Sequence, residues 1–397
     1  MDSRVDRFFH GIKGKKISVI GIGVSHSDLI SRLNDYGAKV TAHDRRTREE
    51  VGEAICNNFE ARGVKLRLGE DYLENIDADI VLRTPGMKFH HPVLERLRRD
   101  GVAVTSEMEL FFDLCPCKTI GITGSDGKTT TTTLLGKIFE NAGRVTHVAG
   151  NIGYPLSAVA MKSKKDDVVV VEVSSFQLES IKTFHPRVAA LLNITEDHLN
   201  RHGTMAQYIR LKQRLFENQT ERDYAVLNMD DPVLFKMAGK LKSQVAFFSR
   251  TQPVENGAFV DGGKIVWQWN GARRAICDAD QILIPGPHNL ENALAATAMA
   301  CFMGVPAPVI RHTLQSFSGV EHRIEKVRVF QGVTYINDSK GTNVDSTIKA
   351  VQSMKAPTVL LLGGYDKHTD FMPLCREIIA SGRIDAVSYT HLRAHET

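Results

Sequence analysis

The fold of this chain follows from residues 121–130, which read GITGSDGKTT. An apolar run typical of a buried strand, residues 118–123, leads into this stretch, and residues 131–141 after it favour a helix. A glycine-rich turn between a strand and a helix directs backbone N–H groups and the positive end of the helix dipole at phosphate groups. The stretch predicts a nucleotide site in which Lys128 contacts the β- and γ-phosphates and the Thr129 hydroxyl binds Mg²⁺.

Two details of this loop depart from the strict phosphate-loop pattern. Ile122 occupies the position of the first glycine of that pattern, and the glycines stand at 121 and 124 instead. Asp126 places an acid beside an anion site. The alternative interpretation is a glycine-rich turn without a ligand. The strand, the Gly-Lys-Thr-Thr run and the helix together favour the phosphate loop.

One acid, Glu172, lies within the apolar run Val168–Val173. The valines before it are apolar on both faces, as in a central strand of a parallel sheet. A buried carboxylate without a partner is costly, and a Mg²⁺ ion at the phosphate site would compensate it. The alternative is a structural acid with an ordinary partner.

Polar clusters follow further predicted strands, at the edge where parallel sheets bind ligands. Residues 193–200 contain His198, a candidate metal ligand or acid–base group, although a histidine is more often structural. Residues 337–343 form a dense cluster of this kind. His322 and Arg323, before the last of these strands, are positioned to bring a cation to a phosphate.

Two helices carry further candidates. Asn289 and Asn292 share one face near a helix start, where they suit hydrogen bonds to a ligand or simply cap the helix. Lys212 lies on a predicted helix between Arg210 and Arg214. By spacing alone, these three side chains form a solvated charged face.

Strands alternate with helices along most of the chain, which indicates parallel sheets with helical crossovers. We expect an α/β protein with a Rossmann-like N-terminal domain (1–107), a central phosphate-loop ATPase domain (108–319) and a partial, Rossmann-like C-terminal domain (320–397). Residues 21–23, Gly-Ile-Gly, form half of a dinucleotide fingerprint. His26 replaces its third glycine, which weakens NAD binding and still permits a diphosphate loop.

Composition excludes several classes of protein. The 397 residues include 50 Lys and Arg against 46 Asp and Glu, a formal net charge of +4, which does not suggest a nucleic-acid binder. The sequence has no run of about 18 apolar residues and no apolar signal core at its start, so we expect no membrane insertion. Six cysteines without a Cys-x-x-Cys pair favour a reduced, cytoplasmic compartment, and Cys115 and Cys117 lack the second ligand pair of a metal site.

The combination of motifs resembles the Mur ligase family, the ATP-dependent ligases that build the peptide stem of peptidoglycan. The resemblance covers residues 15–386. Its motifs are GITGSDGKTT, GNIG (150–153), EVSSFQLE (172–179), NITEDHLNRHG (193–203), HNLENALAA (288–296), EHR (321–323), NDSKGTN (337–343) and GGYDKHTDF (363–371). NDSKGTN with GGYDK is typical of the branch that adds D-glutamate. The Asp-Asn-Pro-Arg signature of the branch that adds diaminopimelate or lysine is absent from the sequence.

The resemblance implies an ADP-forming amide ligase that adds D-glutamate to UDP-N-acetylmuramoyl-L-alanine through an acyl phosphate. It implies ATP, two Mg²⁺ ions and a carbamate on Lys212, and so overrides the solvated-face interpretation of that lysine. Arg210 and Arg214 would lower its pKa and keep the amine neutral for carbamylation. The catalytic residues implied are Lys128, His198 and Lys212. The metal ligands implied are Thr129, Glu172, His198 and Lys212.

The resemblance also assigns binding residues. Those implied for ATP are Gly124, Ser125, Asp126, Gly127, Lys128, Thr129, Thr130, Asn289, Asn292, Arg323 and Asp338. Those implied for the UDP-linked substrate are Ser25, His26, Asp44, Arg45, Thr84 and Asn151. Those implied for D-glutamate are Lys340, Thr342 and Lys367.

Family members carry a later C-terminal segment that closes on D-glutamate and that this sequence lacks. We therefore expect a truncated chain whose last residues, about 387–397, are not native. The alternatives are an impaired ligase that binds nucleotide only, a folylpolyglutamate-type ligase, and a phosphate-loop motor or switch. We expect a monomer with apolar edges left exposed by the unfinished C-terminal sheet.

Overall fold

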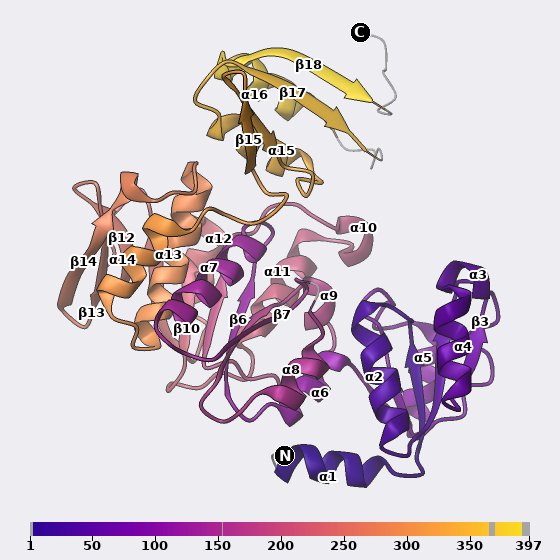
Figure 1. Cartoon of the computed structure of the whole chain (residues 1–397). Coiled ribbons are helices and arrows are strands. Elements are labelled where there is room, and N and C mark those ends of the chain that lie inside the picture. Colours follow the sequence, from indigo (N-terminus) through magenta and orange to yellow (C-terminus); the bar gives the residue numbers. More distant parts are fainter. Residues whose placement is uncertain (1–2, 153, 365–369, 391–397) are drawn as a thin grey trace.

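The computed structural model describes residues 3–152, 154–364 and 370–390. The strands of this part of the chain form a five-stranded sheet, a nine-stranded sheet and two two-stranded sheets. They build an N-terminal unit, a central unit and a C-terminal unit (Figure 1). The α/β class expected from the sequence is confirmed. Among the described helices, none combines the length and apolarity needed to cross a membrane.

The N-terminal unit is a parallel sheet in the order β3-β2-β1-β4-β5. The order reverses beside β1, which is the Rossmann-like arrangement. Its strands are β1 (Lys16–Ile20), β2 (Lys39–Asp44), β3 (Lys65–Leu68), β4 (Ile80–Leu82) and β5 (Ala103–Thr105), and its helices are α1 (Ser3–Ile12), α2 (Val24–Asp35), α3 (Arg48–Val51), α4 (Glu53–Ala61) and α5 (Pro92–Arg99). The sequence did not predict β3, because this edge strand alternates basic side chains with half-buried leucines and offers no apolar run.

The central unit follows the linking helix α6 (Glu107–Leu114) and has the strand order β14-β13-β12-β11-β10-β9-β6-β8-β7. The strands from β7 to β12 run parallel to their neighbours, and β12, β13 and β14 pair antiparallel. The strands are β6 (Lys118–Thr123), β7 (Thr146–Gly150), β8 (Val168–Glu172), β9 (Val188–Leu191), β10 (Tyr224–Asn228), β11 (Gln244–Ser249), β12 (Gly257–Asp261), β13 (Lys264–Trp269) and β14 (Ala272–Asp278). The helices are α7 (Lys128–Asn141), α8 (Leu156–Lys162), α9 (Ser175–Leu178), α10 (Leu199–His202), α11 (Met205–Gln213), α12 (Pro232–Ala238), α13 (Pro287–Phe302) and α14 (Ala307–Ser316).

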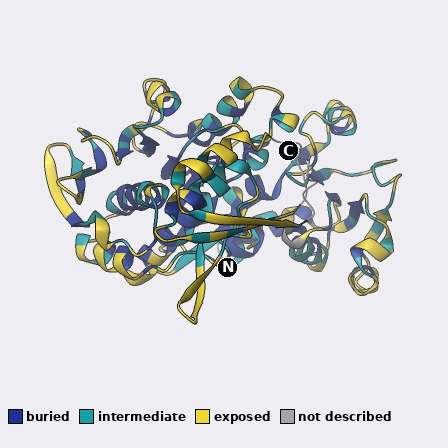
Figure 2. Cartoon of the chain, turned by 90° about the horizontal axis from the view of Figure 1, so that it is seen from above, coloured by how far each residue is buried: buried dark blue, intermediate teal, exposed yellow. Residues whose placement is uncertain are grey.

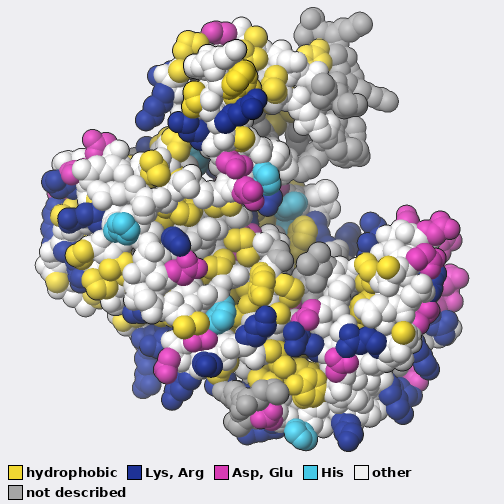
Figure 3. Space-filling view, viewed as in Figure 1, with side chains coloured by type: hydrophobic (Ala, Val, Ile, Leu, Met, Phe, Trp, Pro, Cys, Tyr) yellow, Lys and Arg dark blue, Asp and Glu magenta, His cyan; other side chains and the backbone are white. Residues whose placement is uncertain are grey.

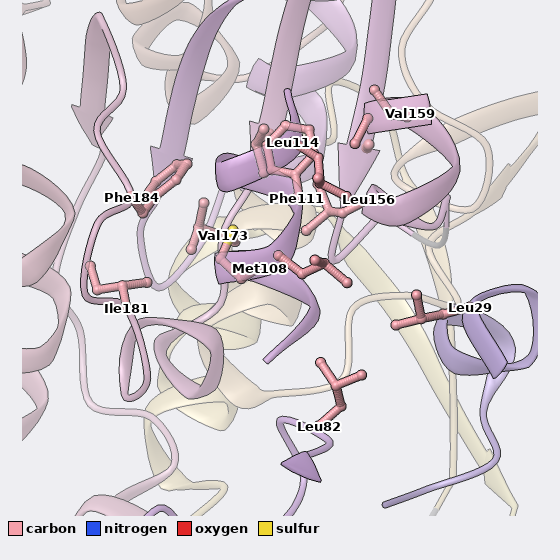
Figure 4. Close-up of a cluster of buried hydrophobic side chains, with 14 of the residues drawn as sticks. Leu29, Leu82, Met108, Phe111, Leu114, Leu156, Val159, Val173, Ile181 and Phe184 are labelled. Carbon is pink, nitrogen blue, oxygen red and sulfur yellow. The ribbon is translucent and has the colours of Figure 1, made fainter. Parts of the chain in front are cut away.

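Helices cover both faces of the central sheet, and this explains why β8 is buried along its whole length. One core contains side chains of β6, α7, α13 and α14. The other contains side chains of β8, β9, α6 and α8 and continues into the N-terminal unit. Figure 4 shows part of this second core, in which Leu29 and Leu82 of the N-terminal unit belong to the same cluster as Phe111 and Leu156.

The C-terminal unit has two small sheets and two helices. An antiparallel hairpin joins β15 (Glu325–Phe330) to β16 (Val333–Asn337), and β17 (Thr358–Gly363) pairs parallel with β18 (Ile384–Thr390); the helices are α15 (Val344–Ser353) and α16 (Met372–Ser381). Many of its apolar side chains are exposed, as expected, and they appear as yellow areas on this unit in Figure 3. Residues 387–390 of the predicted non-native tail lie in β18, and residues 391–397 lie outside the described residues.

Candidate functional site

The predicted phosphate loop connects β6 to α7 at the carboxyl end of the central sheet. Gly127, the residue before the helix, has a φ of 78°, in the left-handed region that favours glycine. A Cβ at this position would lie 2.3 Å from Oδ1 of Asn292 on α13. Both the backbone and the neighbouring helix therefore require glycine here. Thr129 and Thr130 follow in the first turn of α7, where backbone N–H groups have no intrahelical acceptor.

Residues that follow β9 hold this loop in place. The Asp126 N–H donates to Oδ1 of Asn193 at 2.9 Å, and the Asn193 amide donates back to the Asp126 carbonyl at 3.2 Å. Ser125 Oγ donates to the Thr195 carbonyl at 3.0 Å and accepts from the Thr195 N–H at 2.9 Å. The loop is thus shaped by the protein's own hydrogen bonds, which reduces the ordering that a bound phosphate must impose.

Two lysine amines meet at the carbonyl oxygen of Gly124. Lys128 Nζ donates to this oxygen at 2.9 Å and to the Ser125 carbonyl at 2.7 Å. Lys212 Nζ donates to the same Gly124 oxygen at 2.7 Å. Burial lowers the pKa of Lys128, against the opposing effect of nearby carboxylates, foremost Glu172. A negatively charged ligand at this loop would relieve the repulsion between the two amines.

Lys212 is a buried residue, with 1% of it exposed, so the solvated-face interpretation from spacing is wrong. Burial lowers its pKa well below the usual value, and the charge of Lys128 lowers it further. Arg210 and Arg214, which were expected to lower this pKa, are not its cause. Arg214 instead donates to the Leu178 carbonyl at 2.7 Å, and Arg210 lines a separate cavity.

Glu172 ends β8 beside the phosphate loop and is 2% exposed. Its Oε1 accepts a hydrogen bond from Nδ2 of Asn151 at 2.8 Å. Its Oε2 is buried and has no hydrogen-bond partner among the described residues. A buried carboxylate oxygen left in this state is costly unless a ligand completes it.

His198, a further predicted metal ligand, lies just before α10. Its backbone has a φ of 53°, and its ring is half exposed. Its Nε2 lies 3.4 Å from a carboxylate oxygen of Asp197, and its ring lies against Phe176, with the ring centroids 5.0 Å apart. Within the described ranges, no three His, Cys, Asp or Glu side chains gather as a metal site.

The start of α13 forms one wall of the predicted nucleotide site. Asn292 Oδ1 accepts from Oγ1 of Thr131 on α7 at 3.1 Å, and its amide donates to Oδ1 of Asn289 at 3.1 Å. Asn289 in turn donates to the Pro285 carbonyl at 2.6 Å. Beside them, burial lowers the pKa of His288 to about 4, and its Nδ1 has no hydrogen-bond partner in the described part of the chain.

The C-terminal unit supplies charged groups to the same site. Burial raises the pKa of Asp338, and its Oδ1 accepts from the Ile324 N–H at 3.0 Å. Arg323 opposes the effect of burial on the pKa of Asp338, and it is one of the cations that lower the pKa of Asp126. Nζ of Lys349, on α15, contacts Oδ2 of Asp126 at 2.7 Å. In Figure 1 this unit stands over the phosphate loop region at the end of β6.

Residues predicted for the UDP-linked substrate lie at the carboxyl edge of the N-terminal sheet, with one exception. Asp44 accepts from the Ile22 N–H at 2.7 Å and pairs with Arg46 at 2.9 Å, whereas Arg45 is exposed. A Cβ at Gly21 would lie 2.9 Å from Cβ of Thr84, so the two loops touch.

His26 is buried, with Nδ1 3.0 Å from the Gly21 carbonyl. The side chain of Ser25 lies outside the described part of the structure. Asn151 is the exception, because it belongs to the central unit and contacts Glu172 instead of the N-terminal sheet.

The residues predicted for D-glutamate are the least organised. Lys340 and Thr342 are exposed in the loop between β16 and α15. Lys367 lies outside the described residues. The assignment of these residues to D-glutamate stays a prediction.

A separate cavity of about 750 Å³ lies between the N-terminal and central units. Its lining includes Phe89, Arg201, Arg210 and Lys242, and none of the predicted site residues belongs to it. Arg201 donates to the Pro85 carbonyl at 2.9 Å and thereby holds the loop after Thr84 against the central unit.

Sequence reasoning missed four residues of the site: Asn193, Tyr208, Arg46 and Lys349. Asn193 stood inside a quoted motif, and only its place after a strand signalled a role. Tyr208, whose hydroxyl lies 3.1 Å from Ser125 Oγ, and Lys349 come from helices without any local signal. Arg46, which pairs with Asp44, follows directly after Arg45, the residue predicted to bind the UDP-linked substrate.

The chain is similar in sequence to known proteins. The Mur ligase middle domain family matches residues 122–300. A UDP-N-acetylmuramoylalanine–D-glutamate ligase of Thermoanaerobacter sp. (strain X514) is 44% identical over 363 residues, which cover 91% of this chain and 79% of the relative. The enzyme of the same name from Alkaliphilus oremlandii is 45% identical over 363 residues, covering 91% of this chain and 80% of the relative.

Solved structures share the fold. A MurF ligase of Thermotoga maritima in complex with ADP matches with a TM-score of 0.58 and 18% identity, over 97% of this chain and 83% of that one. A pseudomurein peptide ligase type C of Methanothermus fervidus matches with a TM-score of 0.56 and 20% identity, over 97% of this chain and 91% of that one.

Proposed function

The chain belongs to the Mur ligase family, and we infer from this membership and from its site that it adds D-glutamate to UDP-N-acetylmuramoyl-L-alanine with ATP. It is an ATP-dependent amide ligase of peptidoglycan precursor synthesis. The observation that carries the assignment to this site is Glu172. Its buried, uncompensated carboxylate oxygen faces a phosphate loop with two lysine amines on one carbonyl.

The reaction has two steps. The carboxylate of the L-alanyl group attacks the γ-phosphorus of ATP, and the bond to the β,γ-bridging oxygen breaks, which gives an acyl phosphate and ADP. The amine of D-glutamate then attacks the acyl carbon, and inorganic phosphate leaves as the amide forms and the amine loses a proton. Both steps gather negative charge that the protein must offset.

The chain's own residues supply that offset at the nucleotide. Lys128 is placed to exchange its two carbonyl contacts for phosphate oxygens. The N–H groups of Lys128, Thr129 and Thr130 at the start of α7 point toward the same anion. Asn289 and Asn292 form the wall beside it, and Arg323 and Asp338 approach from the C-terminal unit.

Two Mg²⁺ ions are part of the proposal, and the residues fit them. The bare Oε2 of Glu172 and the Thr129 hydroxyl are oxygen donors of the kind that Mg²⁺ prefers, and a carbamate on Lys212 would add another anionic oxygen. The His198 imidazole would add a nitrogen donor. When bound, the ions would neutralise charge on the phosphates.

The carbamate on Lys212 is supported by the burial of its amine. CO₂ adds to a neutral amine with the loss of one proton, and a lysine that is 1% exposed beside another ammonium group favours the neutral form. Carbamylation would leave Nζ with one N–H, enough to keep its hydrogen bond to the Gly124 carbonyl, and would convert the group to an anion. Incubation with ¹³C-labelled bicarbonate should give a carbamate carbon resonance that the Lys212→Ala variant lacks.

Substrate placement completes the proposal. The UDP-linked substrate lies along the carboxyl edge of the N-terminal sheet, with Asp44, His26 and Thr84 at its nucleotide end. D-Glutamate reaches the C-terminal unit through Lys340, Thr342 and Lys367. We include a monomer in the proposal, and a cytoplasmic location, which the six free thiols support.

The test measures ADP release from this chain with ATP, Mg²⁺ and UDP-N-acetylmuramoyl-L-alanine, with and without D-glutamate. We expect release that depends on D-glutamate and not on L-glutamate or L-lysine. Binding of ATP and of the sugar nucleotide without release would identify a nucleotide binder without turnover. The exposed strands of the C-terminal unit favour that second candidate. Failure to bind either ligand would refute the site assignment.

A further inference from the structure

The acid in the phosphate loop, Asp126, has an ion-pair partner from a distant part of the sequence. Nζ of Lys349, on α15 of the C-terminal unit, lies 2.7 Å from Oδ2 of Asp126. Both side chains are largely shielded, with 27% of the lysine and 17% of the aspartate side chain exposed. The contact joins two residues 223 positions apart, and it lies inside the nucleotide site.

Several neighbours define the setting of this pair. A small pocket of about 30 Å³ is lined by Asp126, Asn193, His288, Asn292 and Lys349. The helix that carries the lysine also approaches the start of α13. A Cβ at Gly286 would lie 2.5 Å from Oγ of Ser353 on α15. The lysine is therefore held by its helix at the wall of the site, and it does not reach there as a loose surface side chain.

The charges around the Asp126 carboxylate show what the lysine does. Burial by itself would raise the pKa of Asp126, but Lys349, Lys128 and Arg323 outweigh burial and keep the pKa below its usual range. The carboxylate is thus charged in a loop whose task is to accept phosphate. Two negative groups that approach each other in a partly buried site repel strongly unless a cation is shared between them.

We propose that Lys349 is a positioning residue of the nucleotide site, which neutralises Asp126 and ties the C-terminal unit to the phosphate loop. The proposal rests on the nucleotide-binding part of the proposed function and not on ligation. Removal of the lysine leaves a buried carboxylate facing the phosphates, and a buried charge that loses its partner is more damaging than the loss of both. The effect of the lysine on nucleotide affinity should therefore depend on Asp126.

The experiment is a double-mutant cycle on Mg·ADP binding, measured by isothermal titration calorimetry on the full chain. We expect Lys349→Met to raise the Kd about tenfold, and Lys349→Arg to stay within about threefold of the unchanged protein. In the Asp126→Asn background, Lys349→Met should change the Kd less than about twofold. The exposed Lys355→Met, just after the same helix, is the matched control and should leave the Kd unchanged.

Three outcomes would overturn the proposal. An equal rise in Kd in both backgrounds would mean that Lys349 acts on the nucleotide without Asp126. An unchanged Kd for Lys349→Met would mean that the ion pair is incidental. A fall in melting temperature for Lys349→Arg as large as that for Lys349→Met, with equal loss of affinity, would mean a purely structural role. Failure of the unchanged protein to bind Mg·ADP would instead refute the proposed function, together with any role of Lys349 there.

Discussion

Strands β8 and β17 have similar sequences and opposite surroundings. β8 reads VVVVE and is buried at every residue, whereas β17 reads TVLLLG and alternates between half-buried and exposed residues. The difference comes from the layers around them. β8 has a paired strand on each side and helices on both faces, whereas β18 is the one strand that pairs with β17 among the described residues. Figure 2 shows the exposed residues that result in the C-terminal unit.

The comparison teaches that an apolar strand does not create its own core. Each Å² of apolar surface removed from water contributes about 25 cal/mol of stabilising free energy, and this contribution arises only where a second layer covers the side chains. The central sheet has that layer and places charged groups with precision at its edge. The C-terminal unit lacks much of it, and its contact with the nucleotide site depends on a few polar groups such as Lys349.

The largest effect should come from the one acid of the buried strand. Glu172→Gln keeps the shape of the side chain but removes the charge that would hold a cation, so we expect ADP release to fall at least about 100-fold. The melting temperature should not fall, because the amide oxygen can keep the hydrogen bond from Asn151 and Oε2 has no hydrogen bond among the described residues to lose. The exposed Glu140→Gln on α7 is the control. Full activity of Glu172→Gln would refute a metal role.

A matched pair of leucines tests the packing difference directly. Leu191 on β9 is 0% exposed and Leu361 on β17 is 76% exposed. Leu191→Ala should lower the free energy of unfolding by about 3 kcal/mol, since it leaves a cavity, and Leu361→Ala by less than about 0.5 kcal/mol. Urea denaturation of both variants measures this. Equal losses would show that the C-terminal strands are packed as well as the central ones.

Protonation of His288, which lies where the central and C-terminal units meet, should lower the stability of the protein in acid. Burial lowers its pKa to about 4, against about 6.5 when unfolded. Between these values the unfolded chain binds the extra proton, so stability is lost as pH falls from about 6.5 to 4, by up to about 3 kcal/mol. Below that range the loss stops.

His288→Gln should lose less stability than the unchanged protein between pH 6.5 and 4, with urea midpoints as the measurement. Parallel losses in both proteins would place the acid sensitivity elsewhere, for example in the carboxylates of the central unit.

The smallest effect concerns the exposed apolar face. Leu361→Lys removes an apolar side chain from the surface of β17 and should raise the solubility limit without lowering the melting temperature by more than about 2 °C. Static light scattering against concentration measures the change. A marked loss of stability would mean that Leu361 packs against something in solution.

Prediction from sequence was confirmed for the local structure around the phosphate-loop motif. The strand before it, the turn at Gly127 and the helix that begins at Lys128 lie where the sequence predicts them. The roles of Lys128 at the phosphates and of Glu172 at a metal stay predictions. The four valines of β8 also give the central strand. Prediction failed where the signal lies in another part of the chain. Nothing near Lys349 reveals that it meets Asp126, because that contact depends on how α15 is set against the loop.

Lys212 shows the same limit from the other direction. Arg210 and Arg214 lie two positions before and after it in the sequence, and this pattern predicted a solvated face. In the structure, Lys212 is buried. The resemblance to a family replaces that interpretation with a role as a metal ligand, which stays a prediction. The lowered pKa comes from burial and Lys128, and the flanking arginines are not its cause. Charge effects follow distance in space, and distance in sequence is a poor guide to it between helices and loops.

The continuous core between the first two units has a consequence for dissecting the protein. Side chains of α1, α2, α6 and α8 belong to one apolar cluster, although the first sheet ends at Thr105 and the second begins at Lys118. The connection therefore separates two sheets but does not separate two independent hydrophobic cores. Separating the chain there would expose an apolar surface on each fragment. In the intact protein, the two sheets should unfold together, and their slowest amide protons should exchange with solvent in the same cooperative opening.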